Sequence, residues 1–368
     1  MECSERRIFD SCTREALEKL FVDAPDEKVF RNILANWDRI AKPLDGMGRF
    51  ETITARIGAI AGTEEIETSP KAVIILCADN GIVAEGVSQS GQEVTAAVAR
   101  QMGKGASSVG KMAAAAGADT IPVDIGINSG EPIPGVLHRK IRRGTRNFRT
   151  EPAMTEEEAV KAVFTGIGLA AECKEKGYRI LATGEMGIGN TTTSSAVAAA
   201  LLKCGAEEVT GRGAGLGDEK LRHKKRIIEE ALARYKLYEA APLRVLETVG
   251  GLDIAGLAGV CIGGGLFHIP VVLDGVISMT AALLAERIVP GTAAYLIPSH
   301  KGKEPAVEKL MKELRLEPVI DGRMALGEGT GAVMMFSLLE TALCVYRGRT
   351  LFSDIQVKQY ERYVPQAR

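Results

Sequence analysis

The chain has 368 residues, of which 46% are hydrophobic, and its formal net charge is −1, from 46 basic and 47 acidic residues. That length and apolar content allow one large domain or two domains with a buried core. A nearly neutral balance argues against general binding to nucleic acids or anionic membranes, since both need an excess of positive charge. We therefore predict no nucleic-acid partner and no membrane partner.

The cysteines and histidines indicate a reducing compartment and no metal site. The seven cysteines are dispersed without a CxxC pair, and the four histidines are isolated, so no group has metal-ligand spacing. The first ten residues, MECSERRIFD, lack the apolar core of a signal peptide. The sequence therefore predicts a cytoplasmic protein. The most apolar stretch, 254–273, contains three consecutive glycines and a proline, so we interpret it as a buried helix, a turn and a strand rather than a membrane span.

The apolar pattern predicts an α/β fold. Residues 1–65 are expected to be helical, because apolar residues recur three to four apart around 14–21. The run KAVIILCA at 71–78 is continuously apolar and rich in β-branched residues, which fits a strand buried on both faces of a parallel sheet. Similar runs recur at 120–124, 179–183 and 269–273, with Ala-rich helical stretches between them. This alternation predicts helices on both faces of the sheet, with ligands bound at the carboxyl ends of the strands.

The sharpest motif is GEMGIGNTTT at 184–193, which follows a predicted strand and opens a helix. Its glycines let the backbone approach a ligand closely. The first helical turn offers free N–H groups and the positive end of the helix dipole, which together suit a phosphate. The motif is not a Walker A loop, because the lysine is missing. The alternative is a glycine-rich turn whose threonines only cap the helix.

A second glycine cluster, GRGAGLGDE at 211–219, is followed by a basic segment that contains Lys224. The GxGxxG spacing fails in every register, so a dinucleotide fingerprint is not supported. Lys224 either reaches back to a phosphate as a point charge or belongs to a solvated basic helix face.

Glu328 lies between glycines in the segment LGEGTG at 326–331, with apolar residues before and after it. Burial in such a segment would disfavour the charged carboxylate, which suits a general base that works near neutral pH. The alternative is an exposed glutamate in a glycine turn. A fourth segment, 79–95, is a polar loop after the first predicted strand and fits a substrate-binding loop.

Together and in this order, these segments resemble the nicotinate-nucleotide–dimethylbenzimidazole phosphoribosyltransferase family of the cobalamin pathway. The similarity runs nearly end to end. It includes Trp37, Lys42-Pro43, the 79–95 loop, RGTRN at 143–147, EPAMT at 151–155, GEMGIGNTT at 184–192, the cluster 211–224, Gly250-Gly251, LDG at 273–275 and LGEGTGA at 326–332.

The resemblance implies a Rossmann-like parallel sheet with helices on both faces, plus a small helical domain built from N- and C-terminal segments. On this basis residues 1–65 form the N-terminal helical part of the small domain. Residues 66–340 form the large α/β catalytic domain, and residues 341–368 complete the small domain. The resemblance also implies a homodimer, small-molecule substrates, and no metal or organic cofactor.

The implied reaction transfers ribose 5-phosphate from nicotinate mononucleotide to dimethylbenzimidazole or a related lower-ligand base, giving α-ribazole 5-phosphate and nicotinate. The resemblance assigns Glu328 as the catalytic base and Glu185 as a second carboxylate near the ribosyl centre. The implied phosphate and nucleotide site comprises Gly187, Gly189, Asn190, Thr191, Gly213, Gly215 and Lys224. The implied acceptor-base site comprises Ser88, Gln92 and Met186.

The chain departs from the family pattern at two places. Asp79-Asn80-Gly81 stands where the family usually has Asp-His-Gly, and His300 to Ala306 (HKGKEPA) stands where it usually has His-x-Ser-x-Glu-Pro-Gly-His. The first departure leaves open which base is natural: dimethylbenzimidazole, another benzimidazole, adenine or a phenolic compound. Two other functions stay open. One is a nucleotide-binding subunit without catalysis, against which Glu185 and Glu328 argue. The other is a nicotinate-nucleotide glycohydrolase, which would leave the loop around Gln92 without a role.

Overall fold

The computed structural model describes residues 12–362, so residues 1–11 of the predicted N-terminal helical part and residues 363–368 of the C-terminal segment lie outside the described residues. Within the described part, six strands form one parallel sheet with the order β3-β2-β1-β4-β5-β6. The strands are β1 (Lys71–Ala78), β2 (Ala118–Gly126), β3 (Leu137–His138), β4 (Ile180–Met186), β5 (Val271–Leu273) and β6 (Leu296–Pro298). This order places a topological switch point between β1 and β4, where sheets of this kind bind ligands.

Helices connect and surround the strands. The α-helices are α2 (Arg14–Glu18), α3 (Glu27–Arg39), α4 (Arg49–Ala61), α5 (Glu93–Gly103), α6 (Ser108–Ala115), α7 (Glu156–Glu175), α8 (Asn190–Leu202), α9 (Ala206–Val209), α10 (Asp218–Tyr235), α11 (Pro242–Val249), α12 (Leu252–Leu266), α13 (Val276–Ile288), α14 (Ala306–Leu314) and α15 (Thr330–Arg347). Short 3-10 helices are η2 (Gly81–Glu85), η3 (Leu237–Glu239) and η4 (Thr292–Tyr295).

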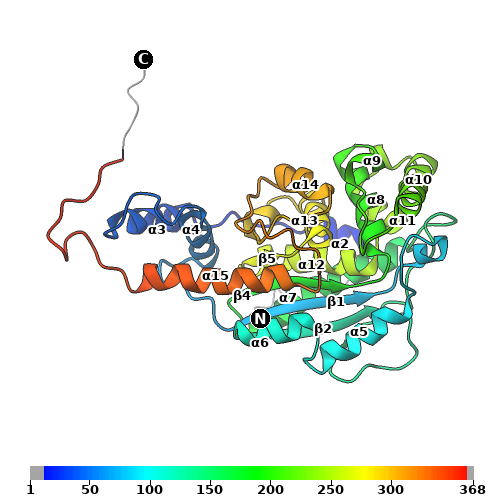
Figure 1. Ribbon diagram of the computed structural model, residues 1–368, viewed down its shortest axis with the longest axis horizontal. Coiled ribbons are helices and arrows are strands. Elements are labelled where there is room, and N and C mark those ends of the chain that lie inside the picture. Colours follow the sequence, from blue (N-terminus) through cyan, green and yellow to red (C-terminus); the bar gives the residue numbers. More distant parts are fainter. Residues whose placement is uncertain (1–11, 363–368) are drawn as a thin grey trace, which may run out of the picture.

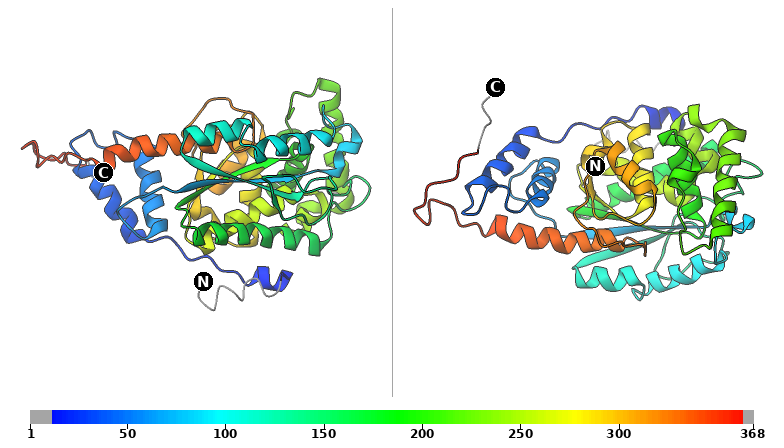
Figure 2. Two further views of the ribbon diagram at one scale, coloured as in Figure 1. Left: turned by 90° about the horizontal axis from the view of Figure 1, so that it is seen from below. Right: turned by 45° about the horizontal axis from the view of Figure 1, so that its top comes forward.

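Both faces of the sheet are buried, as the apolar run at 71–78 predicts. Every residue of β1 is buried, and its side chains alternate between two hydrophobic cores. Ile74 and Leu76 pack on the face of α7 and α12, whereas Val73 and Ile75 pack on the face of α5, α6 and α15. Figure 2 shows the sheet between these two helical layers in its left view. Burying each such side chain contributes about 1.5–3 kcal/mol to folding.

A smaller helical region, made of α3, α4 and the C-terminal half of α15, lies at one end of the molecule (Figure 1). The rings of Trp37 in α3 and Tyr346 in α15 have centroids 5.1 Å apart. The Trp37 indole N–H donates a hydrogen bond to Thr54 of α4 over 3.0 Å. N- and C-terminal segments therefore build this region together, which confirms the predicted fold class. Residue 340, where the sequence predicts the end of the large domain, lies inside α15, because this one helix extends from the sheet into the helical region.

The predicted strands at 71–78, 120–124, 179–183 and 269–273 correspond to β1, β2, β4 and β5. The stretch 254–273 is a buried helix, a turn and a strand, as predicted. Within residues 12–362, none of the helices combines the length and the apolar character needed to span a bilayer. One boundary differs in a way that matters for the site. Strand β4 extends to Met186, so Glu185 and Met186 belong to the strand and not to the loop after it.

Candidate active site

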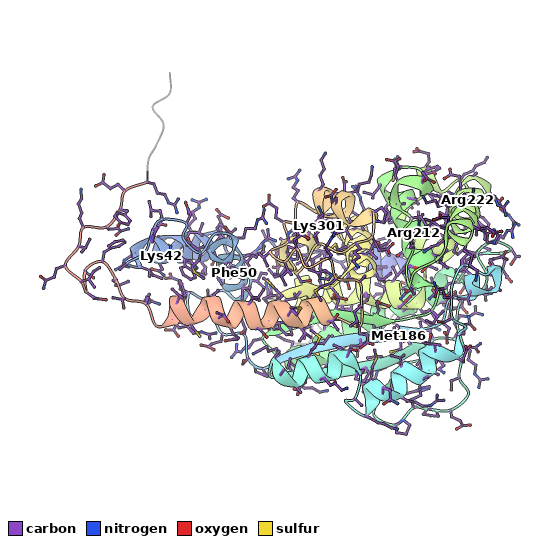
Figure 3. All side chains as sticks on the ribbon, viewed as in Figure 1. Lys42, Phe50, Met186, Arg212, Arg222 and Lys301 are labelled. Carbon is purple, nitrogen blue, oxygen red and sulfur yellow. The ribbon has the colours of Figure 1, made fainter. Side chains whose placement is uncertain are left out.

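A cavity of about 260 Å³ lies at the carboxyl ends of β4, β5 and β6, on the edge of the sheet where the sequence predicts ligand binding. Figure 3 places Met186 at the end of the sheet and Arg212 and Lys301 on the loops above it, whereas Lys42 and Phe50 lie in the smaller helical region. The lining residues come from five segments, which lie within 185–191, 213–214, 274–278, 300–307 and 324–327.

The loop between β4 and α8 forms one wall of the cavity. Gly189 is the N-cap of α8 with φ +93°, and no side chain caps this helix, so the alternative in which threonines cap it does not hold. Gly187 has no room for a side chain, because a Cβ there would lie 2.7 Å from the Oδ2 atom of Asp253. These glycines bring backbone and a helix N-terminus to the cavity surface, which favours an anionic ligand group.

Lys224, in α10, lies behind this wall. Its side chain is fully buried, and its ammonium group donates hydrogen bonds to Thr191 Oγ1 over 2.9 Å and to the backbone oxygen of Gly211 over 3.3 Å. Both partners are neutral, and within residues 12–362 Lys224 forms no ion pair. Burial lowers the pKa of Lys224 to about 8, and Glu304 opposes that change. The solvated-helix alternative is therefore wrong, and a buried cation without an ion pair among the described residues suits a phosphate.

Carboxyl groups gather on another part of the wall. The side-chain amide nitrogen of Asn190 donates to Glu185 and also to Asp253, the latter over 3.1 Å. Burial, followed by the charge of Asp253, raises the pKa of Glu185 to about 8. Burial likewise raises the pKa of Asp253 to about 6. The carboxylate side of the cavity is thus built to hold a proton, or to receive positive charge.

The loop that carries Glu328 lies against β4. Gly327, Glu328 and Gly329 have φ values of +83°, +62° and +97°, a conformation that strains a residue with a side chain by about 1–3 kcal/mol. A Cβ at Gly184 would collide with the backbone oxygen of Glu328, and a Cβ at Gly327 would lie 2.9 Å from Glu185 Oε1. The two glycines thus let the Glu328 loop approach Glu185 closely.

Two further groups hold this loop in place. The carboxylate of Asp274 accepts hydrogen bonds from the N–H groups of Gly329 and Gly331, over 3.2 and 2.8 Å. The half-buried Glu328 accepts a hydrogen bond from the Val109 N–H, at the start of α6, over 3.1 Å. The geometry of the Glu328 carboxylate is therefore determined by three different parts of the chain.

The predicted site residues fall into three groups by position. Those that line the cavity are Glu185, Met186, Gly187, Asn190, Thr191 and Gly213. Those that belong to the same loops and helices without lining it are Gly189, Gly215, Lys224 and Glu328. The remaining two, Ser88 and Gln92, lie in the 79–95 loop outside the lining. The Gln92 amide donates to the backbone oxygen of Asn80 and accepts from Asn128, both over 3.1 Å.

Sequence reasoning missed four polar residues of this region: Asp253, Asp274, His300 and Glu304. A signal for Asp253 was present, because it is the only acidic residue between Glu247 and Asp274 in a long apolar stretch. The structure buries it completely. A lone charge in an apolar helix is expensive to bury, which indicates a specific role.

Comparison with known proteins places the chain in a family. Residues 22–357 match a family model described as phosphoribosyltransferase. The nicotinate-nucleotide–dimethylbenzimidazole phosphoribosyltransferases of Clostridium acetobutylicum and Acetivibrio thermocellus are each 43% identical to the chain. These matches cover 92% and 89% of the chain and 97% and 93% of the two relatives. The solved structure of the enzyme of the same name from Thermus thermophilus has a TM-score of 0.85 at 37% identity, covering 91% of this chain and 100% of that one. The chain therefore belongs to the nicotinate-nucleotide–dimethylbenzimidazole phosphoribosyltransferase family.

Proposed function

We propose that the chain transfers the 5-phosphoribosyl group of nicotinate mononucleotide to dimethylbenzimidazole or a related lower-ligand base in the assembly of the cobalamin nucleotide loop. The observation that carries this proposal is the charge pattern of the cavity. A buried cation without an ion pair lies behind Thr191, and the half-buried Glu185 and the buried Asp253 both accept hydrogen bonds from Asn190. Nicotinate mononucleotide carries the complementary charges, a phosphate and a quaternised ring nitrogen.

The proposed phosphate site consists of Gly187, Gly189, Asn190, Thr191, Gly213, Gly215 and Lys224. The fully buried ammonium group of Lys224 supports it, because a phosphate would supply the missing counter-charge. The glycine backbone and the start of α8 supply further N–H donors near Thr191. Holding the phosphate firmly would fix the ribose relative to the incoming base, which lowers the entropic part of the barrier.

In the proposed mechanism, a ring nitrogen of the base attacks C1 of the ribose, and the bond between C1 and the nicotinate nitrogen breaks. Nicotinate leaves with its ring nitrogen neutral, so the leaving group needs no proton. The other ring nitrogen of the base loses its proton to Glu328. The Val109 N–H holds Oε2 of Glu328, so we assign the proton to Oε1. Glu185 faces the positive charge that develops on the ribose in the transition state.

The acceptor base is proposed to lie near Met186, Ser88 and Gln92. Met186 lines the cavity, and the loop that carries the other two is joined to the phosphate side through a hydrogen bond from Gln89 to the backbone oxygen of Gly215. Asn80, which stands in place of the usual histidine, is tied to Gln92 through its backbone.

We also infer that two copies pair and that the enzyme works in the cytoplasm. Met334, Leu338 and Val345 are exposed on α15 at a spacing that puts them on one face, which supports a covered surface. The described cysteines are free, which supports a reducing compartment. Light scattering tests the pairing: Leu338→Glu should yield monomers, and a monomeric parent protein would contradict it.

Product analysis tests the proposed function. The purified protein is incubated with nicotinate mononucleotide alone, and with dimethylbenzimidazole, adenine or p-cresol added. We expect nicotinate release to depend on an added base and to match the formation of a ribosylated phosphate product. Release without any base would identify a glycohydrolase. Binding of nicotinate mononucleotide without release under any condition would identify a subunit without catalysis.

A further inference from the structure

Asp253 is a buried acid that the proposed mechanism does not use. It lies in the first turn of α12 and is fully buried, and it does not line the cavity. Its Oδ1 atom accepts a hydrogen bond from the Ile254 N–H over 3.0 Å, and its Oδ2 atom accepts from the Asn190 amide nitrogen over 3.1 Å. Within residues 12–362 it forms no ion pair. An ionised acid in this setting costs folding free energy.

The surrounding sequence leaves space for this acid. A Cβ at Gly251 would collide with Asp253 Oδ1, and a Cβ at Gly187 would lie 2.7 Å from its Oδ2. Gly187 belongs to the cavity wall itself. The carboxyl group of Asp253 is therefore packed directly behind the wall, with glycines on two sides where an apolar side chain would pack if stability alone mattered.

Asn190 connects Asp253 to the cavity. Its amide group has one nitrogen with two hydrogens, and that nitrogen donates to both Glu185 and Asp253. Asn190 and Glu185 line the cavity, whereas Asp253 does not. Asn190 therefore links Asp253 to Glu185 by hydrogen bonds, and the charge of Asp253 also acts on Glu185 directly.

We propose that Asp253 is a positioning residue for the transfer: through the hydrogen bonds of Asn190 it holds the carboxyl group of Glu185 at the cavity wall where the cationic substrate binds. Its own negative charge disfavours a second negative charge on Glu185 until that substrate binds. This inference rests on the proposed function. Before the substrate binds, the carboxyl groups of Glu185 and Asp253 share one amide donor, and ionising both would place two like charges next to each other. A cationic substrate supplies the missing positive charge, so Glu185 releases its proton to solvent on binding and then faces the developing charge on the ribose.

Other groups also act on Glu185 and must be considered in any pH measurement. The charged or titratable groups that face it are Asp253 in α12, Asp274 after β5, Glu328 before α15 and Cys77 in β1, while the Asn190 amide from α8 favours its ionised form. The titrations of Glu185 and Asp253 are coupled, so observed values belong to the pair.

The test is the pH profile of kcat/KM for Asp253→Asn, which keeps the shape of the side chain and removes its charge. We expect the ionisation on the acidic side of the profile, where Glu185 loses its proton, to move to lower pH by about one unit, since a like charge near Glu185 is gone. The maximal kcat/KM should fall, by up to about 100-fold, because Asn190 loses a fixed acceptor. Asp124→Asn is the matched control. It removes a buried carboxylate at the end of β2, outside the cavity lining, and should leave the profile midpoint in place.

An unchanged midpoint in Asp253→Asn with reduced stability would overturn the proposal and leave Asp253 a purely structural residue. If that variant does not fold, infrared difference spectra of the parent protein decide the matter. A protonated carboxyl band that disappears when nicotinate mononucleotide binds, and that is missing in Glu185→Gln, supports the proposal, and its absence overturns it. A parent protein that makes no ribosylated product contradicts the proposed function instead, so the two failures are distinguishable.

Discussion

Two regions at and behind the cavity wall carry opposite charges, and among the described residues neither region forms an ion pair. In the phosphate region, formed by Thr191, Gly213 and Lys224, a buried ammonium group has only neutral hydrogen-bond partners. In the carboxylate region, formed by Glu185, Asp253 and Glu328, the acids have only amide and N–H partners. The regions meet at Asn190 and Thr191, neighbours in the first turn of α8. Opposite charges that lie this near without pairing indicate that a ligand supplies both counter-charges.

A lysine outside the cavity is a useful contrast. The side chain of Lys140 is largely buried, pairs with Asp124 over 3.1 Å and donates to the backbone oxygens of Ile127 and Ser129, so it ties its loop together. Its donors are saturated by the protein. Lys224 is buried more deeply and lacks such a charged partner. The difference separates a lysine that serves the fold from one that is available to a ligand.

The largest expected loss of activity comes from a substitution in the carboxylate region. Glu328→Gln should fold normally and lose activity by about 10²–10⁴-fold, because the amide does not take the proton of the incoming base. Steady-state turnover with dimethylbenzimidazole measures it, with Glu317→Gln, an exposed acid of the preceding loop, as the control. Activity within a few-fold of the parent would assign the base to another group.

The next largest effect is in the phosphate region. Lys224→Met should weaken binding of nicotinate mononucleotide by about 10- to 150-fold, corresponding to about 1.5–3 kcal/mol for a hydrogen bond to a charged group. Binding of nicotinate riboside, which has no phosphate, should change little. Calorimetry with both ligands measures the difference. Lys225→Met is the matched control, because that neighbour pairs with the exposed Glu207 on the surface.

The pH dependence sharpens this prediction. Burial lowers the pKa of Lys224 to about 8, so the parent protein should lose affinity for nicotinate mononucleotide as the pH rises through 8 and the ammonium group loses its proton. Lys224→Met should lack that loss. Equal changes for mononucleotide and riboside would contradict a phosphate role for Lys224.

How much of the fold and of the site the sequence predicts depends on the length of the apolar pattern in each segment. The eight-residue run of β1 and the buried stretch 254–273 follow from composition and periodicity alone. Strands β3 and β6 do not, because two or three residues show no period. The apolar neighbours of Glu328 indicated a buried segment, yet Leu326 is 55% exposed, since the loop before Glu328 forms the cavity rim.

Contacts between residues that are far apart in the sequence are harder to predict than local sequence motifs. Asn190 and Asp253 are 63 residues apart, and only the packing at the carboxyl ends of the strands brings them together. The glycines of the motif at 184–193 predict a close approach of the backbone to a ligand. They do not predict that Gly187 and the distant Gly251 both pack against the carboxyl group of Asp253. The surroundings raise the pKa of Glu185 to about 8. This shift follows from packing between distant segments, which no local sequence pattern encodes.

Glu185→Gln tests how much the carboxylate region lowers the stability of the folded protein in the absence of ligand. The folded pKa of Glu185 is about 8 and its ordinary value is 4.5, so the folded protein keeps a proton that the unfolded chain loses in that window. Stability of the parent should therefore fall as the pH rises from 4.5 through 8. Glutamine does not titrate, so the variant's Tm advantage should grow to a few degrees by about pH 9 in calorimetric melts. A constant difference between about pH 5 and pH 9 would show that Glu185 ionises freely.

The smallest expected effect lies outside both regions, at Gln92. Its amide joins the backbone of Asn80 to the Asn128 side chain, so it shapes the loop proposed to contact the base. Gln92→Ala should shift the product ratio between dimethylbenzimidazole and p-cresol by roughly three- to tenfold, because one neutral hydrogen bond is worth about 0.5–1.5 kcal/mol. The ratio is measured in an equimolar mixture, with Gln101→Ala, at an exposed position of the helix that Gln92 precedes, as the control. If Gln92→Ala keeps the parent ratio, base selection lies with cavity-lining residues such as Met186, and the two charged regions then act on the nucleotide alone.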